Sequence, residues 1–328
     1  MRTYSRAITP KYLLAGLILT AFVFPALSDD FPSKPIHIMV ATAAGGPTDL
    51  TARVIGKFIS QYSGQPVVVE NKPGGGGTQA LGETAKASPD GYTLSFAAAG
   101  EIVIHPFLYK DLPYNPLKDV VPVALAAEAP QVLVISSNVP VHNLQEFIAY
   151  AKAHPGEINY GSSGTGGTPQ LGALRFAKLA DVKITHVPYR GAPLATADLI
   201  AGRIQMLHIT PLPVIGPAKA GLVRILAIAQ PHRSSALPDV PTSAEAGLPG
   251  YETSLWFGLF APRGTPKTVI DKIYGWVRDM NNDPQYRKQL GDLFYEPAIM
   301  SPEDFQAKIN KEAPEWEHDV HEFGLRIE

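Results

Sequence analysis

The chain alternates short apolar runs with longer stretches in which apolar positions recur at helical spacing. Apolar runs at residues 36–41, 67–70 and 92–97 predict β-strands, and the amphipathic stretches 50–62 and 79–87 between them predict helices. This alternation is typical of βαβ units, in which neighbouring strands run parallel. The first part of the chain is therefore expected to form an α/β sheet.

A second series of the same kind begins at residue 144. Its predicted helices are 144–154, 169–179 and 192–201, and its predicted strands are 158–160, 184–187, 204–209 and 225–229. Strands at 120–128 and 131–136 stand between the two series without a helix between them. The chain ends with a strand at 255–261 and helices at 266–279, 284–290 and 302–323, while the Gly/Pro-rich stretch 211–250 is expected to be one long ordered loop.

These elements predict an α/β fold with two lobes, each built on a mixed, mainly parallel sheet flanked by helices. The pattern changes near residues 130 and 253, so we assign residues 29–130 and 254–328 to lobe 1 and residues 131–253 to lobe 2. Each series opens with a strand, a Gly/Thr-rich loop and a helix. We therefore expect a cleft between the lobes, lined by these two loops.

The first 28 residues have the pattern of a secretory signal peptide. Arg2, Arg6 and Lys11 precede an apolar stretch from 12 to 27, and residues 26–28 offer the small-x-small pattern of a cleavage site. The alternative is an N-terminal membrane anchor, but the stretch is shorter than the roughly 20 residues that a span needs and contains Pro25. Cleavage after residue 28, with no cysteine to carry a lipid, predicts an exported protein that is not lipid-anchored.

Composition narrows the function classes. The chain has 28 basic and 30 acidic residues, and without residues 1–28 the balance is 25 to 30. No basic domain or stripe is present, so we expect no nucleic-acid partner. The absence of cysteine excludes thiolate nucleophiles and Cys-ligated zinc. Glycine (29) and proline (31) are in moderate excess, which predicts loops of unusual backbone geometry.

Two of these Gly-rich loops carry the candidate chemistry. Residues 42–49 (TAAGGPTD) and 161–169 (GSSGTGGTP) each join a predicted strand to a predicted helix. A loop of small residues that ends in a helix N-terminus exposes unpaired N–H groups at the positive end of the helix dipole, which suits an anion. The alternative is that glycine and threonine merely turn the chain. The candidate ligand residues are Ala43, Ala44, Gly45, Gly46, Thr48 and Asp49 in the first loop and Ser162, Ser163, Gly164, Thr165, Gly166 and Thr168 in the second.

Three further candidates lie outside these loops. Ala99 follows a predicted strand and belongs to the small side chains that would line the cleft. His208 ends the strand 204–209 and is either a structural core histidine or a ligand contact, and Asp198 is either a solvated acid or a buried acid that supports a cleft loop. Arg190 and Arg203 are either counter-charges for an acidic ligand or ordinary salt-bridge residues.

No catalytic, nucleotide or metal motif is complete. The Walker pattern is absent, the serine-hydrolase and dinucleotide patterns near 161–169 each miss a required glycine, and His318 and His321 lie in a charged, solvated helix. We therefore expect no enzyme activity, no metal and no cofactor.

An ordered set of motifs resembles the Bug proteins, the TctC-like substrate-binding components of tripartite tricarboxylate transporters. The motifs are FPSKPI at 31–36, GGPTD at 45–49, VENKPG at 69–74, PDGYTL at 89–94, HVPYRG at 186–191, LPDVPT at 237–242, EAGLPGY at 245–251, APRGTP at 261–266 and SPEDF at 301–305. The resemblance implies a periplasmic-binding-protein fold of the type II-like "Venus flytrap" kind. It also implies that residues 45–49 hold a ligand carboxylate through backbone N–H groups and water, that residues 162–168 supply the donors of the second lobe, and that Asp198 matches a recurrent acid.

The resemblance thus implies a periplasmic protein, expected to be monomeric, that captures a small carboxylate and delivers it to membrane permease subunits. Di- or tricarboxylates and aromatic carboxylates such as terephthalate are the ligand candidates. The alternatives left open are an accessory protein that senses the ligand for a receptor kinase and an exported hydrolase. The first loop lacks the proline-rich lead-in of many relatives, and Arg190 replaces the commoner lysine.

Overall fold

The computed structural model describes residues 31–74, 77–253 and 255–327. The predicted signal peptide, residues 1–28, lies outside the described residues. Within the described ranges, none of the helices combines the length and the apolar character that crossing a membrane requires.

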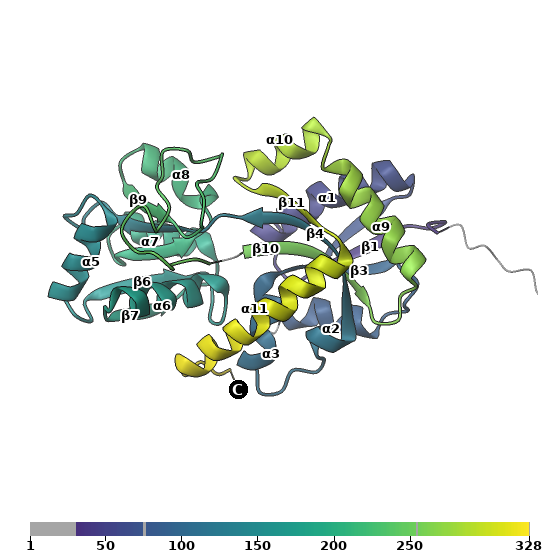
Figure 1. Cartoon of the computed structure of the whole chain (residues 1–328), viewed down its shortest axis with the longest axis horizontal. Helices are drawn as coiled ribbons and strands as arrows, with labels where there is room; N and C mark the ends of the chain where they lie inside the picture. Colours follow the sequence, from purple (N-terminus) through teal and green to yellow (C-terminus); the bar gives the residue numbers. More distant parts are fainter. Residues whose placement is uncertain (1–30, 75–76, 254, 328) are drawn as a thin grey trace, which may run out of the picture. The chain divides into compact units, whose positions relative to one another are not determined.

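The first lobe is built on a six-stranded mixed sheet (Figure 1). Strand β1 pairs in parallel with both β2 and β3, whereas β10 pairs antiparallel with β3 and β4, and β11 pairs antiparallel with β4. The order across the sheet is β11-β4-β10-β3-β1-β2. The strands are β1 (Ile36–Val40), β2 (Val67–Asn71), β3 (Thr93–Ala98), β4 (Val120–Ala129), β10 (Leu255–Pro262) and β11 (Glu296–Met300).

Side-chain alternation in these strands feeds two apolar cores, one on each face of the sheet. Leu94 and Phe96 of β3 join the core beneath α1 (Pro47–Ser63), α9 (Lys267–Met280) and α10 (Pro284–Asp292). Ala97 joins the other core, beneath α2 (Thr78–Lys86), α3 (His105–Leu108) and α11 (Pro302–Glu322). The same face also carries η2 (Gly100–Ile104) and α4 (Pro116–Asp119). Because successive strand residues point to opposite faces, one strand serves both cores.

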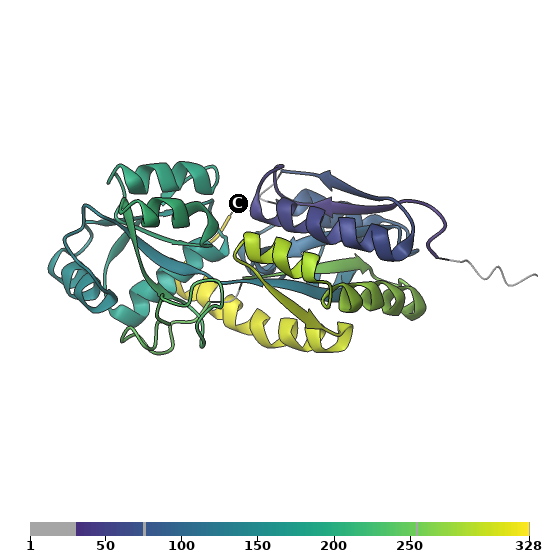
Figure 2. The same ribbon diagram turned by 90° about the horizontal axis from the view of Figure 1, so that it is seen from above.

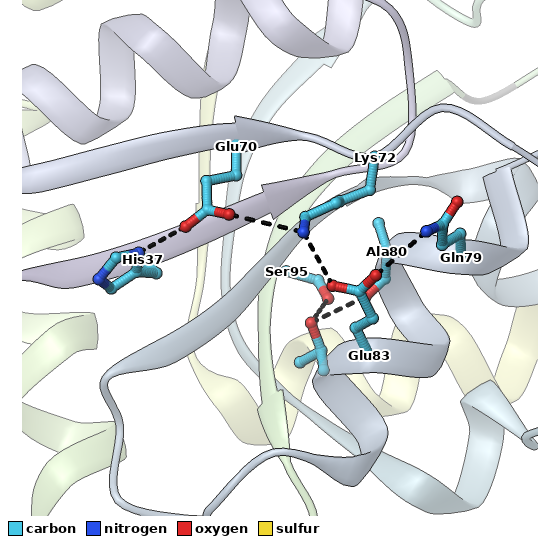
Figure 3. A network of polar contacts seen from close by, with 8 residues as sticks. His37, Glu70, Lys72, Gln79, Ala80, Glu83 and Ser95 are labelled. Carbon is cyan, nitrogen blue, oxygen red and sulfur yellow. Dashed lines mark hydrogen bonds and ion pairs between the residues drawn. The ribbon is translucent and has the colours of Figure 1, made fainter.

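A polar network ties α2 to the sheet beside the start of that helix (Figure 3). Glu70 of β2 lies 2.6 Å from His37 Nδ1 and 3.7 Å from Lys72 Nζ, and Lys72 lies 3.2 Å from Glu83 of α2. Inside the lobe, Ser95 Oγ donates to Thr84 Oγ1 over 2.6 Å. These contacts hold α2 against β1, β2 and β3.

The second lobe has a five-stranded mixed sheet in the order β7-β6-β8-β5-β9. Its strands are β5 (Val132–Ser136), β6 (Ile158–Ser162), β7 (Ile184–Pro188), β8 (Met206–Ile209) and β9 (Val223–Ile228). Helices α5 (Leu144–Ala153) and α6 (Thr168–Ala180) cover one face, and α7 (Ala192–Ile200) and α8 (Leu212–Lys219) cover the other (Figures 1 and 2). Strand β6 pairs in parallel with β7 and β8, whereas β5 pairs antiparallel with β8 and β9.

Three features differ from the sequence-based expectation. The stretch 211–250 was expected to be a loop, but it contains helix α8. Proline is tolerated at the start of a helix, where Pro213 lies, and Pro217 does not end the helix. Strand β11 and the helical segment 99–108 had no clear periodic signal. Antiparallel pairing is also more frequent than expected, because β4, β5 and β10 carry the chain between the two sheets and do not belong to βαβ units.

The chain crosses from one sheet to the other in two segments, one next to Gln131 and one next to Thr253, which we call the passages. Backbone N–H groups link the two passages: Ala229 donates to Gln131 O over 2.9 Å, and Thr253 donates to Ala229 O over 2.9 Å. These passages are the segments about which the lobes could move.

Candidate functional site

The first candidate loop joins β1 to α1 at the carboxyl edge of the first sheet. Helix α1 begins with Gly46 as N-cap and Pro47 in its first turn, and it has no side-chain cap. Its first-turn N–H groups therefore point toward the loop without a side-chain acceptor from the described residues. Ala43, Ala44 and Gly45 are exposed, and Gly45 has a φ of 84°, a conformation that favours glycine.

Asp49 lies behind this loop and fixes its shape. Its side chain is 2% exposed. Oδ2 accepts from the Gly45 N–H over 2.8 Å and from Arg53 Nε over 3.1 Å, and Oδ1 accepts from Asn71 Nδ2 over 2.9 Å. Asn71 Nδ2 also donates to Thr42 O over 3.0 Å. The carboxylate is thus saturated by protein donors, and it positions the loop that the sequence placed around the ligand.

The pKa of Asp49 follows from two opposing effects. Burial is the largest influence and favours the neutral acid, but the hydrogen bonds from Arg53, Gly45 and Asn71 together outweigh it, so the pKa lies below its ordinary value. Asp49 is therefore ionised at neutral pH and keeps its hydrogen bonds from Gly45, Arg53 and Asn71.

The second candidate loop joins β6 to α6 and has the same design. Helix α6 has Gly167 as N-cap, no side-chain cap, and proline in its first turn. The sequence had placed Thr168 at the N-cap, one residue later. Ser163 and Thr165 are exposed, whereas Ser162, Gly166 and Thr168 are buried. Two helices in different lobes therefore begin at glycine-rich loops without a side-chain cap.

A chain of hydrogen bonds behind the second loop includes His186 and Gln170, which sequence reasoning missed. Ser162 Oγ lies 2.7 Å from both Gly164 O and His186 Nε2, Gln170 Nε2 lies 3.2 Å from His186 Nδ1, and the Gly166 N–H donates to Gln170 Oε1 over 2.7 Å. All four bonds form only if His186 is neutral and carries its proton on Nε2. Burial lowers the pKa of His186, which favours this neutral form.

This proton arrangement bears on the hydrolase alternative. His186 donates to Ser162 and Ser162 donates to Gly164 O, so the histidine does not act as a base toward the serine hydroxyl. Ser162 is also only 1% exposed. The Ser162–His186 contact therefore shapes the loop and lacks the arrangement of an activated nucleophile.

Asp198 supports the neighbouring turn between β7 and α7. Its Oδ2 accepts from the Tyr189 hydroxyl over 2.8 Å and its Oδ1 from Arg203 Nη1 over 2.7 Å, and these two bonds lower its pKa. Helix α7 follows at Gly191, whose N-cap also lacks a side-chain bond, as does that of α2 at Gly77. Gly191 follows β7 at the same sheet edge as Ser162, because β6 and β7 are parallel. Arg203 is thus a salt-bridge residue, and Arg190 is exposed.

His208 lies inside the second lobe, fully buried next to the two passages of the chain. Its Nε2 lies 3.0 Å from Gln131 Oε1 and 3.0 Å from Thr253 Oγ1, and its Nδ1 lies 2.7 Å from the Tyr251 hydroxyl. Burial lowers its pKa to about 3. Both ring nitrogens are thus committed to protein partners that flank the passages, and the neutral ring holds Gln131 and Thr253 together.

Gln131 extends this arrangement to the second loop, because its Nε2 lies 3.4 Å from Thr168 Oγ1. A Cβ on Gly172 of α6 would lie 2.2 Å from the His208 ring, so glycine at this position allows α6 to approach. The start of α6 is therefore connected to the passages between the lobes.

Because His208 is buried in its neutral form, the fold is expected to lose stability in acid, and the variant His208→Gln is expected to lose less. The pKa of His208 in the folded state lies below the unfolded value of about 6.5. The stabilisation that neutral His208 contributes is therefore present above pH 6.5 and is lost as the pH falls below it. Between pH 7 and pH 5 the loss due to His208 is about 2 kcal/mol. Urea denaturation at both pH values is expected to give a smaller difference for His208→Gln than for the wild type. Equal differences would contradict the assignment.

A hollow of about 260 Å³ lies elsewhere, beside α11. Its lining includes Glu128, Lys308 and Glu312, which pair with one another, and Arg175, which lies over the Trp316 ring. It contains no residue of either candidate loop. Because its central charges are already paired within the protein, we place the candidate site at the loops.

Neither metal nor enzyme chemistry gains support from the described residues. No three His, Asp or Glu side chains in the described ranges lie close enough together to hold a metal ion. Asp49 and His186, the ionisable groups directly behind the two loops, are engaged by protein hydrogen bonds, so the exposed part of the loops offers backbone N–H groups, small side chains and hydroxyls.

This fold and this site define a two-lobed solute-binding protein. A family model described as "Tripartite tricarboxylate transporter family receptor" matches residues 51–325, and the chain belongs to this family. The resemblance of the motifs to the TctC-like and Bug proteins is thereby confirmed.

Similar proteins extend over nearly the whole chain. The UPF0065 protein in the tcbD-tcbE intergenic region of Pseudomonas sp. (strain P51) is 35% identical over 319 residues, which is 96% of this chain and 95% of that protein. The structure of R. palustris Rpa4515 with adipate has 32% identity and a TM-score of 0.83, covering 90% of this chain and 99% of that one. MatC from Rhodopseudomonas palustris with bound malate has 34% identity and a TM-score of 0.78, covering 88% and 100%. The predicted periplasmic-binding-protein fold is confirmed.

Proposed function

We propose that the chain captures a small carboxylate between its two lobes and delivers it to the permease of a tripartite tricarboxylate transporter. One observation carries the proposal: α1 and α6 both begin at an N-cap glycine that has no side-chain cap. Such helix starts are ready anion sites, because unpaired N–H groups meet the positive end of the helix dipole.

The energetics favour local donors over long-range attraction. The chain carries 30 acidic and 28 basic residues, so its overall charge does not attract an anion. A charge-assisted hydrogen bond contributes about 1.5–3 kcal/mol. Several such bonds suffice for micromolar affinity, which corresponds to about −8 kcal/mol. The N–H groups of Gly45, Gly46 and Gly166 already donate within the protein, so the other N–H groups of both loops, with the exposed hydroxyls of Ser163 and Thr165, are the proposed donors.

The ligands named for two relatives support a small carboxylate. One relative was solved with adipate and another with malate, both dicarboxylates. In this chain the first loop exposes Ala43 and Ala44, and these short side chains leave room for a longer or aromatic diacid. We propose a dicarboxylate or an aromatic carboxylate as the ligand class.

Binding without catalysis, a periplasmic location and a monomeric state complete the proposal. Residues 1–28 would direct export and then be removed, leaving lobe 1 as 29–130 with 254–328 and lobe 2 as 131–253. Rotation about the passages near Gln131 and Thr253 would close the lobes on the ligand. The permease subunits are the proposed partners because the family is that of transporter receptors.

A ligand screen of the mature protein, residues 29–328, tests the proposal. Thermal denaturation is measured with mono-, di- and tricarboxylates, including adipate, malate, citrate and terephthalate, with glucose and arginine as controls. At least one carboxylate is expected to raise the melting temperature by several degrees, because a ligand at about 100 times its Kd stabilises the fold by about 2.7 kcal/mol. If no carboxylate shifts the melting temperature, the proposed function fails.

A further inference from the structure

Glu101 lies at the same sheet edge as the first loop. Strands β1 and β3 are parallel, with Val40 opposite Phe96, so both strands end at this edge. The chain leaves β3 at Ala98 and enters a short π-helical segment, η2, that carries Glu101. Single π-helical turns are rare and are found frequently at functional sites.

The Glu101 carboxyl group is enclosed but only half used. The residue is 7% exposed. Its Oε2 accepts from the Ala98 N–H over 2.5 Å. Its Oε1 lies 3.4 Å from the position that a Cβ on Gly77 would occupy, and the Ala41 methyl group lies 3.3 Å from the same position. Glu101 Oε1 therefore lies beside the end of β1 and the start of α2.

No cation of the described residues forms an ion pair with Glu101. His105, one helical turn further, is buried, and its pKa is lowered to about 4 by that burial, so it is neutral. Its Nδ1 and the Tyr114 hydroxyl have no hydrogen-bond partner among the described residues. Burial raises the pKa of Glu101 to about 7, although the Ala98 bond opposes this effect. The other oxygen, Glu101 Oε1, has no hydrogen-bond donor among the described residues.

Helix capping explains only part of this arrangement. The bond to Ala98 N–H is the backward half of a capping box, which an exposed carboxylate or an amide also makes. Capping does not require that the carboxyl group be enclosed without a counter-charge. Buried ionisable groups of this kind concentrate at functional sites.

We infer that Glu101 is a specificity-determining ligand contact, whose Oε1 accepts a hydrogen bond from a hydroxyl or ammonium group of the bound carboxylate. The N–H groups at the start of α1 take the ligand carboxylate, and Glu101 reads the adjacent substituent. The preferred ligand class is thus a hydroxy- or amino-substituted carboxylate. This inference rests on the proposed function and names its substrate class.

Matched ligand pairs test the inference by calorimetry on the mature protein. Succinate is compared with L-malate and L-aspartate, and adipate with 3-hydroxyadipate, so that the members of a pair differ by one donor group. At a pH well above 7, where Glu101 is ionised despite its raised pKa, the wild type is expected to bind the substituted member roughly tenfold or more tightly, because a hydrogen bond to a charged acceptor is strong. In Glu101→Gln the ratio of L-aspartate to succinate affinity is expected to fall toward one, because an amide NH2 cannot accept from an ammonium group, while the amide oxygen still accepts from Ala98 N–H.

Glu312→Gln is the matched control. Glu312 is also an enclosed carboxylate of lobe 1, 13% exposed, but it is paired with Lys308 and accepts from Trp256 Nε1 over 2.8 Å. This variant is expected to keep the wild-type ratio. Thermal denaturation of both variants verifies that they fold.

The outcomes separate this inference from the proposed function. If the wild type binds both members of a pair equally, or if Glu101→Gln keeps the wild-type ratio, the Glu101 assignment is wrong and the proposed function stands. If the wild type binds no carboxylate of any pair or of the wider screen, the proposed function fails and the inference fails with it.

Discussion

Replacing Gly45 with valine is expected to weaken carboxylate binding by about a hundredfold or more. Gly45 has a φ of 84°, and a side chain in the left-handed region costs about 1–2 kcal/mol, more when it is β-branched. Nothing lies within 4 Å of a Cβ built on Gly45, so the added side chain enters the open space in front of the loop. A turn of the backbone at residue 45 that relieves the strain breaks the Gly45 N–H bond to Asp49 and displaces the loop. Calorimetry with the strongest ligand of the screen measures the effect.

Gly64→Val provides the matched control for this variant. Gly64 ends the same helix, with a φ of 71° and likewise nothing within 4 Å of a built Cβ. Both variants are expected to lose a similar amount of stability, but only Gly45→Val is expected to lose binding. A folded Gly45→Val protein with wild-type affinity would exclude the first loop as the anion site.

Replacing Asp49 with alanine is expected to destabilise the fold and to impair binding together. The change leaves the Gly45 N–H, the Asn71 amide and the Arg53 guanidinium without their shared acceptor. Breaking a buried charge pair costs about 3–5 kcal/mol. Because Arg53 is about half exposed and can reach water, we expect a smaller cost here, a fall of roughly 2–3 kcal/mol in the free energy of unfolding. Chemical denaturation and calorimetry measure the two effects.

Two comparisons sharpen the Asp49 experiment. Asp283→Ala removes an exposed cap of α10, which bonds the Gln285 N–H over 2.7 Å, and is expected to cost about 1 kcal/mol without a change in binding. The pKa of Asp49 is lowered in the fold, so its stabilisation is present above the unfolded value near 3.8 and is lost as the pH falls through the folded value. The acid-induced loss below about pH 4 should therefore be smaller in Asp49→Ala. Wild-type affinity in that variant would show that the loop does not depend on the carboxylate.

The candidate residues fall into two groups: those that form the open loops and those that support the loops from behind. The residues that the sequence assigned by local geometry, Gly45, Gly46 and the small residues of the second loop, lie where α1 and α6 begin without a side-chain cap. For Asp198 and His208 the sequence left a structural role open beside a ligand role, and both, like Asp49, are bonded to protein partners that hold the loops or the passages. Polarity alone does not distinguish a side chain that contacts a ligand from one that supports a loop.

The partners of the supporting residues had no local signal in the sequence. Asn71 reaches Asp49 across 22 positions, His186 reaches Ser162 across 24, and Gln131 reaches His208 across 77. A local pattern carries no information about such partners. The family motif at 69–74 contains Asn71, and the motif at 186–191 begins at His186, so the motifs mark both residues without giving their roles.

The sequence by itself determined the strand–helix alternation, the two glycine-rich loops and the family, because hydrophobic periodicity, glycine and proline act over a few residues. Only the tertiary structure decided that Asp49 and His186 lie behind the loops and that His208 bonds to the passages. It also decided that Glu101 is enclosed without a cation among the described residues. Those outcomes depend on which strands become neighbours in the two sheets, and that pairing joins residues far apart in the chain.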